Sequence, residues 1–185
     1  YSEEETKVLM LNKQAGVICS NKDEEGRKSV FDFLPENTRW VMVGRLDLNS
    51  AGLLLFTNNG DLANKLMHPS SEIDREYAVR VLGRVSDEDI KQLISGIELE
   101  DGFAKFHKVT IGGGDGANRW YHVVVREGRK REVRRLWEAL DFKVSRLIRT
   151  RFSDIRMPDN LRANQSELLK PKQVHALLKA VNLKD

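Results

Sequence analysis

The sequence predicts an α+β fold in which a mixed, mostly antiparallel sheet is flanked by helices. Strand-like and helix-like segments follow one another without the regular β-α-β alternation of a doubly wound parallel fold. Several strand candidates are neighbours in sequence and are separated by turn residues, which is typical of hairpins. A chain of 185 residues, 40% of them hydrophobic, is long enough to bury a substantial core. We therefore expect one domain over residues 1–185.

The first third of the chain contains four strand candidates and a short helix. Apolar residues are concentrated in the four candidate strands, which are 7–11, 16–19, 40–43 and 52–57. A polar and charged stretch, 20–29, predicts a loop. Turn residues at 58–60 precede Asp61, which we expect to cap a helix that ends before Pro69. The apolar side of this helix is predicted to carry Leu62, Leu66 and Met67.

Further strands are predicted in the middle of the chain. A strand over 76–82 alternates apolar and polar residues, and its apolar face carries Tyr77, Val79 and Val81. Segments 105–111 and 119–126 predict a hairpin around the glycine-rich loop 112–116. Another strand is expected over 144–148. Because several strands look hairpin-linked and no regular β-α-β alternation is present, the pattern favours a mainly antiparallel or mixed sheet.

Three more helices complete the prediction. Ser86, followed three residues later by Asp89, resembles a capping box, and the helix that it begins is expected to end at Gly96. Its inward residues are predicted to be Ile90, Leu93 and Ile94. A helix over 131–140 is predicted to face the core with Val133, Leu136, Trp137 and Leu140. Pro171 begins the last helix, which has an apolar side of Val174, Leu177, Leu178 and Val181. We expect Trp40, Trp120 and Trp137 in the core.

Composition excludes several classes of protein. No apolar run approaches the roughly 18 residues of a membrane span. One cysteine, Cys19, cannot form an intramolecular disulfide and suits a reducing compartment, so we expect a cytoplasmic protein. The histidines lack metal-ligand spacing, and loop 112–116 lacks the lysine of a phosphate-binding loop. We expect a monomer with no metal, no cofactor and no membrane association.

The charge is segregated along the chain. Residues 126–156 contain 11 basic and 5 acidic residues, whereas the rest of the chain contains 20 basic and 23 acidic ones. Such a local excess of positive charge is typical of a surface that binds a polyanion, and nucleic acid is the commonest one. A solvated helix face with extra arginines is the alternative interpretation.

The segment 43–56 is the first candidate for chemistry. In extended backbone, Arg45 and Asp47 leave the chain on one side while Leu46 points away. An acid and a base on a polar loop between apolar runs form a plausible reactive site. The alternative is a surface ion pair without function, which contributes little to stability.

The basic segment 127–137 is the second candidate. On a helix, Arg131, Arg134 and Arg135 fall opposite the apolar face, and Arg129 and Lys130 directly precede them. Arginine offers planar, paired donors to phosphate or carboxylate groups. An ordinary amphipathic helix is the competing interpretation. Tyr77 is a third candidate, because its ring either belongs to the core or lines a cleft where it can stack on a nucleobase.

Four segments in this order resemble the RsuA/RluB-type ribosomal RNA pseudouridine synthases. They are GRLDLNSAGLLLFT at 44–57, LANKLMHP at 62–69, REY at 75–77 and EGRKREVRRL at 127–136. The resemblance extends over residues 7–181. It implies the pseudouridine synthase fold, in which a bent sheet surrounds a central catalytic cleft.

The resemblance also implies an activity and roles for individual residues. A uridine within RNA, expected to be ribosomal and of the large subunit, is isomerised to pseudouridine without a cofactor. Asp47 matches the catalytic aspartate, which attacks the ribose or the uracil or deprotonates the sugar. Tyr77 matches the tyrosine that packs on the target base, and Arg134 the basic residue that pairs with the aspartate. Leu147 matches the apolar residue near the base, and Arg45 the motif arginine beside the aspartate.

Two other expectations follow from the resemblance. Members of this family usually carry an N-terminal S4-type RNA-binding domain, and none precedes Tyr1 in this sequence. We therefore expect a catalytic domain that binds RNA more weakly than a longer parent chain. Two competing functions are a non-catalytic RNA-binding module and a metal-dependent nuclease that uses Asp47.

Overall fold

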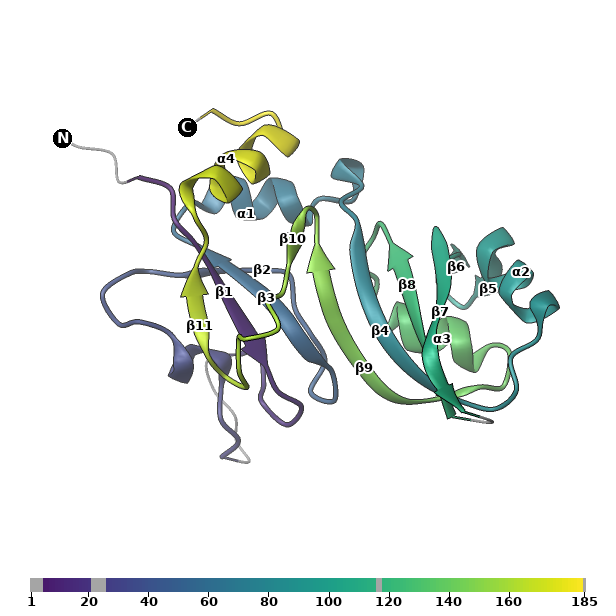
Figure 1. Cartoon of the computed structure of the whole chain (residues 1–185). Helices are drawn as coiled ribbons and strands as arrows, with labels where there is room; N and C mark the ends of the chain where they lie inside the picture. Colours follow the sequence, from purple (N-terminus) through teal and green to yellow (C-terminus); the bar gives the residue numbers. More distant parts are fainter. Residues whose placement is uncertain (1–4, 21–25, 116–117, 185) are drawn as a thin grey trace.

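The computed structural model describes residues 5–20, 26–115 and 118–184. The strands of its large sheet are β1 (Val8–Lys13), β2 (Val41–Val43), β3 (Ala51–Thr57), β4 (Arg75–Leu82), β7 (Lys108–Asp115), β8 (Asn118–Val125), β9 (Lys143–Phe152), β10 (Ile155–Arg156) and β11 (Ser166–Leu168). Two short strands, β5 (Ile97–Leu99) and β6 (Gly102–Ala104), form a separate hairpin. The α-helices are α1 (Gly60–Met67), α2 (Asp87–Ser95), α3 (Glu132–Glu138) and α4 (Pro171–Ala180) (Figure 1). The elements confirm the α+β class.

The large sheet is mixed and mostly antiparallel, as predicted. Its strand order is β11-β1-β3-β9-β4-β8-β7, with β2 beside β3 and β10 beside β9. Among its described pairs, β3 and β9 alone are parallel, and they pair at Ala51 with Ile148 and at Gly52 with Arg149. Gly52 has a φ of +111°, and a side chain there would overlap the backbone of Arg149. This glycine therefore permits the close contact through which the two halves of the sheet join.

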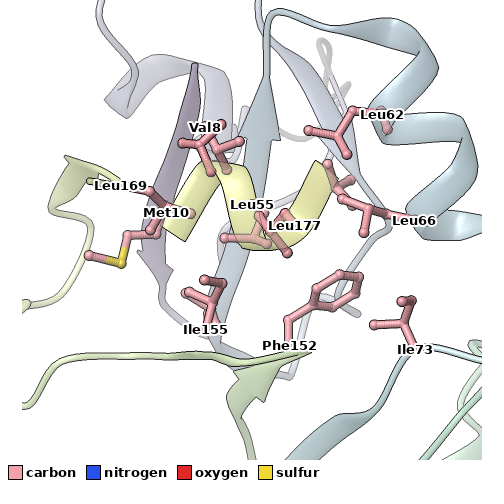
Figure 2. Close-up of a cluster of buried hydrophobic side chains, with 14 of the residues drawn as sticks. Val8, Met10, Leu55, Leu62, Leu66, Ile73, Phe152, Ile155, Leu169 and Leu177 are labelled. Carbon is pink, nitrogen blue, oxygen red and sulfur yellow. The ribbon is translucent and has the colours of Figure 1, made fainter. Parts of the chain in front are cut away.

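One hydrophobic core lies between the first half of the sheet and the helices α1 and α4. Leu55 of β3 and Val8 and Met10 of β1 face Leu62 and Leu66 of α1 and Leu177 of α4 (Figure 2). Leu54 and Phe56 point to the other face of β3, where a second cluster includes Leu46. β3 is thus buried on both faces, which explains its unbroken apolar sequence.

A third cluster lies under α3 in the second half of the sheet. Trp137 of α3 is fully buried and packs against Tyr121 and Phe106, with ring centroids 5.1 and 5.9 Å apart. Val79 and Val81 of β4 belong to the same cluster, as their alternation predicts. Trp137 is in the core as predicted, whereas Trp40 and Trp120 are only partly buried.

Most predicted elements are present, often with longer bounds. The strands near 7–11, 40–43, 52–57, 76–82 and 144–148, the hairpin and all four helices occur. Ser86 forms a capping box with Asp89 on α2. Of the predicted loops, residues 21–25 and 116 lie outside the described residues, and residues 112–115 belong to strand β7 instead of a loop.

Several local predictions are wrong. Segment 16–19 forms no strand and makes an isolated bridge between Ile18 and Ser29. Asn59, not Asp61, caps α1, because its side chain accepts a hydrogen bond from the backbone N–H of Leu62 at 3.1 Å. Ile94 is exposed on α2. The short strands β5, β6, β10 and β11 have no apolar alternation long enough to predict them.

Candidate active site

A cavity of about 760 Å³ lies between loop 44–50, strands β4 and β9 and the segment before α3. Seven of the nine expected site residues line it: Arg45, Asp47, Tyr77, Arg129, Lys130, Arg131 and Leu147. The remaining two, Arg134 and Arg135, belong to α3, whose first residues form part of the cavity wall. The fold therefore brings segments that are far apart in sequence together around this cavity.

Loop 44–50 presents Asp47 to the cavity. Gly44 has a φ of +75°, which allows the chain to turn directly after β2. Leu46 is 7% exposed and packs in the core, so its neighbours Arg45 and Asp47 face outward. The backbone N–H of Ser50 donates to the carbonyl of Asp47 at 3.0 Å and closes the loop. The alternation expected around Leu46 is thus present.

Lys13 supports this loop from beneath. Its side chain is fully buried, and its ammonium donates to the backbone carbonyls of Asp47 at 3.1 Å, Ser50 at 2.7 Å and Gln14 at 3.0 Å. Burial lowers the pKa of Lys13, while the charge on Asp47 acts in the opposite direction. Lys13 was not predicted as part of the site. A lysine at the end of a strongly apolar strand is the one feature of the sequence that could have indicated a buried ammonium group here.

Two arginines at the start of α3 contact the Asp47 loop. The Arg131 Nη1 atom is 3.8 Å from Asp47 Oδ2. Arg134, which was predicted to point away from the core, is 8% exposed and donates from Nη2 to the backbone carbonyl of Asn49 at 3.0 Å. Burial lowers the pKa of Arg134, as does the charge on Arg131, whereas Asp47 raises it. In contrast to the expected pairing, the guanidinium within ion-pair distance of Asp47 belongs to Arg131.

The opposite wall of the cavity is aromatic and apolar. Tyr77 of β4 is half-buried, lines the cavity and packs against two hydrophobic clusters. Leu147 of β9 is 6% exposed and pairs with Val79, two register positions from the pair formed by Tyr77 and Arg149. Tyr77 therefore packs against the core and also lines the cavity, so the core position and the cleft position expected as alternatives are both present.

Two of the expected substrate-binding arginines are engaged in ion pairs within the protein. Arg135 contacts both carboxylate oxygens of Asp101, at 2.8 and 3.0 Å. Arg129 lies 2.8 Å from Glu127 Oε1 and also donates to the backbone carbonyl of Phe103. These contacts fix the 127–131 segment to the β5–β6 hairpin. Lys130 is exposed, and no described carboxylate lies within ion-pair distance of it.

Two carboxyl groups lie beside Arg129, the buried one of Glu132 and the partly exposed one of Glu127. Glu132 is 3% exposed, and burial, followed by its contact with Glu127, raises its pKa to about 8. The Glu127 pKa is lowered, first by a hydrogen bond from Glu132. The raised pKa favours the neutral form of Glu132 at neutral pH, whereas Glu127 stays ionised and pairs with Arg129, whose Nε atom also lies 3.4 Å from Glu132 Oε2.

A second group that the sequence analysis missed consists of buried arginines in the cavity wall. Arg75 donates to the carbonyl of Ile73 at 2.9 Å, and Arg149 donates to that of Leu53 at 2.7 Å. Both guanidinium groups lie over the ring of Phe152, at 5.2 and 5.4 Å from its centroid. They add positive charge to a cavity whose wall already contains Arg45 and Arg131.

Two absences hold for the described part of the chain. Its histidine, cysteine, aspartate and glutamate side chains form no group of three or more that could hold a metal ion. None of its helices is sufficiently long and apolar to cross a membrane.

The sheet, the loop that presents an aspartate and the basic segment before α3 together define a class of RNA-modifying enzymes. The sequence profile described as RNA pseudouridylate synthase matches residues 7–139, and the chain belongs to this family. A solved structure described as a pseudouridylate synthase superposes with a TM-score of 0.83 at 26% identity, covering 95% of this chain and 75% of the other. The expected pseudouridine synthase fold is thereby confirmed.

Curated relatives give a narrower comparison. The ribosomal large subunit pseudouridine synthase B of Yersinia pestis is 57% identical over 157 residues, covering 84% of this chain and 49% of the relative. The protein of that name in Pseudomonas aeruginosa is 50% identical over 186 residues, covering 99% of this chain and 48% of the relative. The chain therefore spans about half the length of these relatives.

Proposed function

We propose that this chain is the catalytic domain of an enzyme that isomerises a uridine in large-subunit ribosomal RNA to pseudouridine. The observation that carries the proposal is the position of Asp47, whose carboxylate lies in a cavity between arginines and the Tyr77 ring. The names of the relatives support ribosomal RNA of the large subunit as the substrate. Ribosomal RNA as the substrate also makes the bacterial cytoplasm the expected compartment.

The reaction breaks the N1–C1′ bond of the uridine and forms a C5–C1′ bond. The hydrogen on C5 leaves as a proton, and N1 gains a proton, so the reaction is an isomerisation without net redox change. A uridine stacked in a helix is out of reach of a protein carboxylate, and it must therefore be flipped out of the stack. The cavity offers the Tyr77 ring and the Leu147 side chain as an apolar surface for the base.

Most of the predicted residues have a role in this proposal. Asp47 attacks the ribose or the uracil, or removes a proton from the sugar. Arg134 holds the Asp47 loop through the Asn49 carbonyl and acts as a positioning residue. Arg131 adds positive charge beside the carboxylate. Arg45 and Lys130 are exposed at the cavity and are available to phosphate groups.

Release of tritium tests this proposal. RNA labelled with tritium at uridine C5 must lose the label when the new C–C bond forms. We expect time-dependent release from large-subunit ribosomal RNA or its assembly intermediates in the presence of a chelator, with the RNA chain intact. Binding without release would favour an RNA-binding module, and chelator-sensitive cleavage would favour a nuclease.

A further inference from the structure

The sheet face opposite the cavity carries an unusual group of side chains. Arg80 of β4 lies directly opposite Trp120 of β8 and Arg146 of β9 in the register. Both guanidinium groups are 5.9 Å from the centroid of the Trp120 ring. The neighbouring residues Val79 and Leu147 point into the core beneath α3, so alternation puts this group on the other face. We call this surface of β9, β4, β8 and β7 the reverse face.

The reverse face is open to solvent. Figure 1 shows α3 on one side of these strands and no helix on the other. Arg146 is exposed, while Arg80 and Trp120 are half-buried. Ala78 and Val124 also lie on this face, where they are buried among the longer side chains at 8% and 6% exposure but belong to none of the three hydrophobic clusters. The helix-covered core and the reverse face are therefore two distinct surfaces of the same strands.

The charge of the reverse face is strongly positive. Register and contacts place seven basic residues on it: Arg80, Lys108, Arg126, Lys143, Arg146, Arg151 and Arg156. Two acidic residues of this face, Asp74 and Glu76, pair with Arg126, Arg151 and Arg156 at one end, and Asp115 occupies a register position on the same face at the other end. No described carboxylate lies within ion-pair distance of Arg80, Arg146, Lys108 or Lys143. This uncompensated charge is complementary to a polyanion.

The geometry of the arginines suits phosphate. Trp120 supports both guanidinium groups, and the Nε atom of Arg80 also donates to Ser145 Oγ at 2.9 Å. Stacking on a ring leaves the outer N–H donors of a guanidinium free and reduces the conformational entropy lost on binding. A patch with so few exposed apolar residues is a poor surface for burying a protein partner.

We propose that the reverse face binds backbone phosphates of the RNA substrate at nucleotides distant from the target uridine. This inference rests on the proposed function, because it takes ribosomal RNA as the polyanion. The cavity and the reverse face lie on opposite sides of one sheet, so a short hairpin seated in the cavity does not reach both. The reverse face therefore contributes to the binding of long structured RNA and leaves the chemistry unaffected.

The test compares long and short RNA with matched variants. Arg80→Gln combined with Arg146→Gln removes two charges while keeping a polar side chain with N–H donors, and Arg146→Gln alone changes an exposed position. The control is Arg84→Gln combined with Lys91→Gln, which removes two exposed charges away from the reverse face. Dissociation constants are measured over a range of salt for a large-subunit ribosomal RNA transcript and for the shortest hairpin that supports tritium release. Melting temperatures verify that each variant is folded.

We expect the double variant to bind long RNA at least about ten-fold more weakly at 0.1 M salt, with a slope of log Kd against log salt lower by roughly 1.5. Arg146→Gln alone gives part of this loss. Hairpin affinity, tritium release from the hairpin and the control remain within about two-fold of wild type. An unchanged slope for long RNA, or an equal loss on the hairpin or in the control, would overturn the inference. Absence of tritium release from the wild type would instead refute the proposed function, and RNA affinity would still be measurable.

Discussion

Arg131 and Asp47 face each other at the cavity, with 3.8 Å between Nη1 of the arginine and Oδ2 of the aspartate. Arg134 lies one helical turn further and donates to the Asn49 carbonyl at 3.0 Å. The ion pair that the resemblance assigns to Arg134 is thus formed by Arg131 in this structure, and Arg134 contacts the backbone of the same loop. Arg131 acts directly on the carboxylate charge, and Arg134 holds the backbone of the loop that carries it.

This division predicts different effects for the two arginines. Arg134→Gln should lower the rate of tritium release by about 100-fold, because a small shift of the Asp47 loop misplaces the reacting group. Arg131→Gln should lower it less than about ten-fold, because Arg131 is largely exposed and its electrostatic effect is screened by solvent. Single-turnover rates at saturating RNA measure both effects. A larger loss for Arg131→Gln than for Arg134→Gln would contradict this assignment.

Lys13 should stabilise both the fold and the loop. Lys13→Met removes a donor from the carbonyls of Asp47 and Ser50, and a buried polar group without a partner costs roughly 1–3 kcal/mol. We expect a fall of about 3 kcal/mol in the free energy of unfolding, measured by urea denaturation. Lys7→Met, at an exposed position just before the same strand, is the control and should change stability little. Equal stability of the two variants would show that the Lys13 contacts do not support the loop.

Glu132 should make stability depend on pH. Its pKa of about 8 in the folded state exceeds the ordinary value of 4.5, so the folded chain holds a proton that the unfolded chain has released. The free energy of unfolding therefore falls as pH rises between about 4.5 and 8. Glu132→Gln keeps the shape and the hydrogen-bond donor but cannot ionise. It should be more stable than wild type at pH 8, by up to about 4 kcal/mol, and the difference should disappear near pH 4. Thermal melts at both pH values measure this, and a difference independent of pH would argue against a protonated Glu132.

Most of the fold was predictable because its main signals are local. Alternation in Tyr77, Val79 and Val81 predicts β4, and the Ser86–Asp89 spacing predicts α2. The short strands β10 and β11 form by pairing with the longer strands β9 and β1. Their own two or three residues are too few to predict a strand. The parallel contact of β3 with β9 joins residues nearly 100 positions apart and could not be predicted from either segment.

The sequence predicted most of the residues that line the cavity, but it predicted fewer of the contacts between them. The basic segment before α3 indicated a group of arginines, but sequence cannot distinguish a phosphate ligand from an ion-pair partner. Arg135 binds Asp101, which lies 34 residues earlier on another element. Lys13 and Arg149 were not predicted as site residues. Their side chains donate to backbone carbonyls, and a sequence does not show which backbone carbonyl will lie next to a given side chain.

We propose that the Asp47 carboxylate carries out the isomerisation. Removal of this carboxylate is the most direct test. Tritium release from C5-labelled ribosomal RNA is measured with wild type and with Asp47→Ala, alongside the affinity of each for the same RNA. We predict no detectable release by Asp47→Ala and an RNA affinity within a few-fold of wild type, because binding is spread over many phosphate contacts. Release by Asp47→Ala at a rate close to that of wild type would contradict the account.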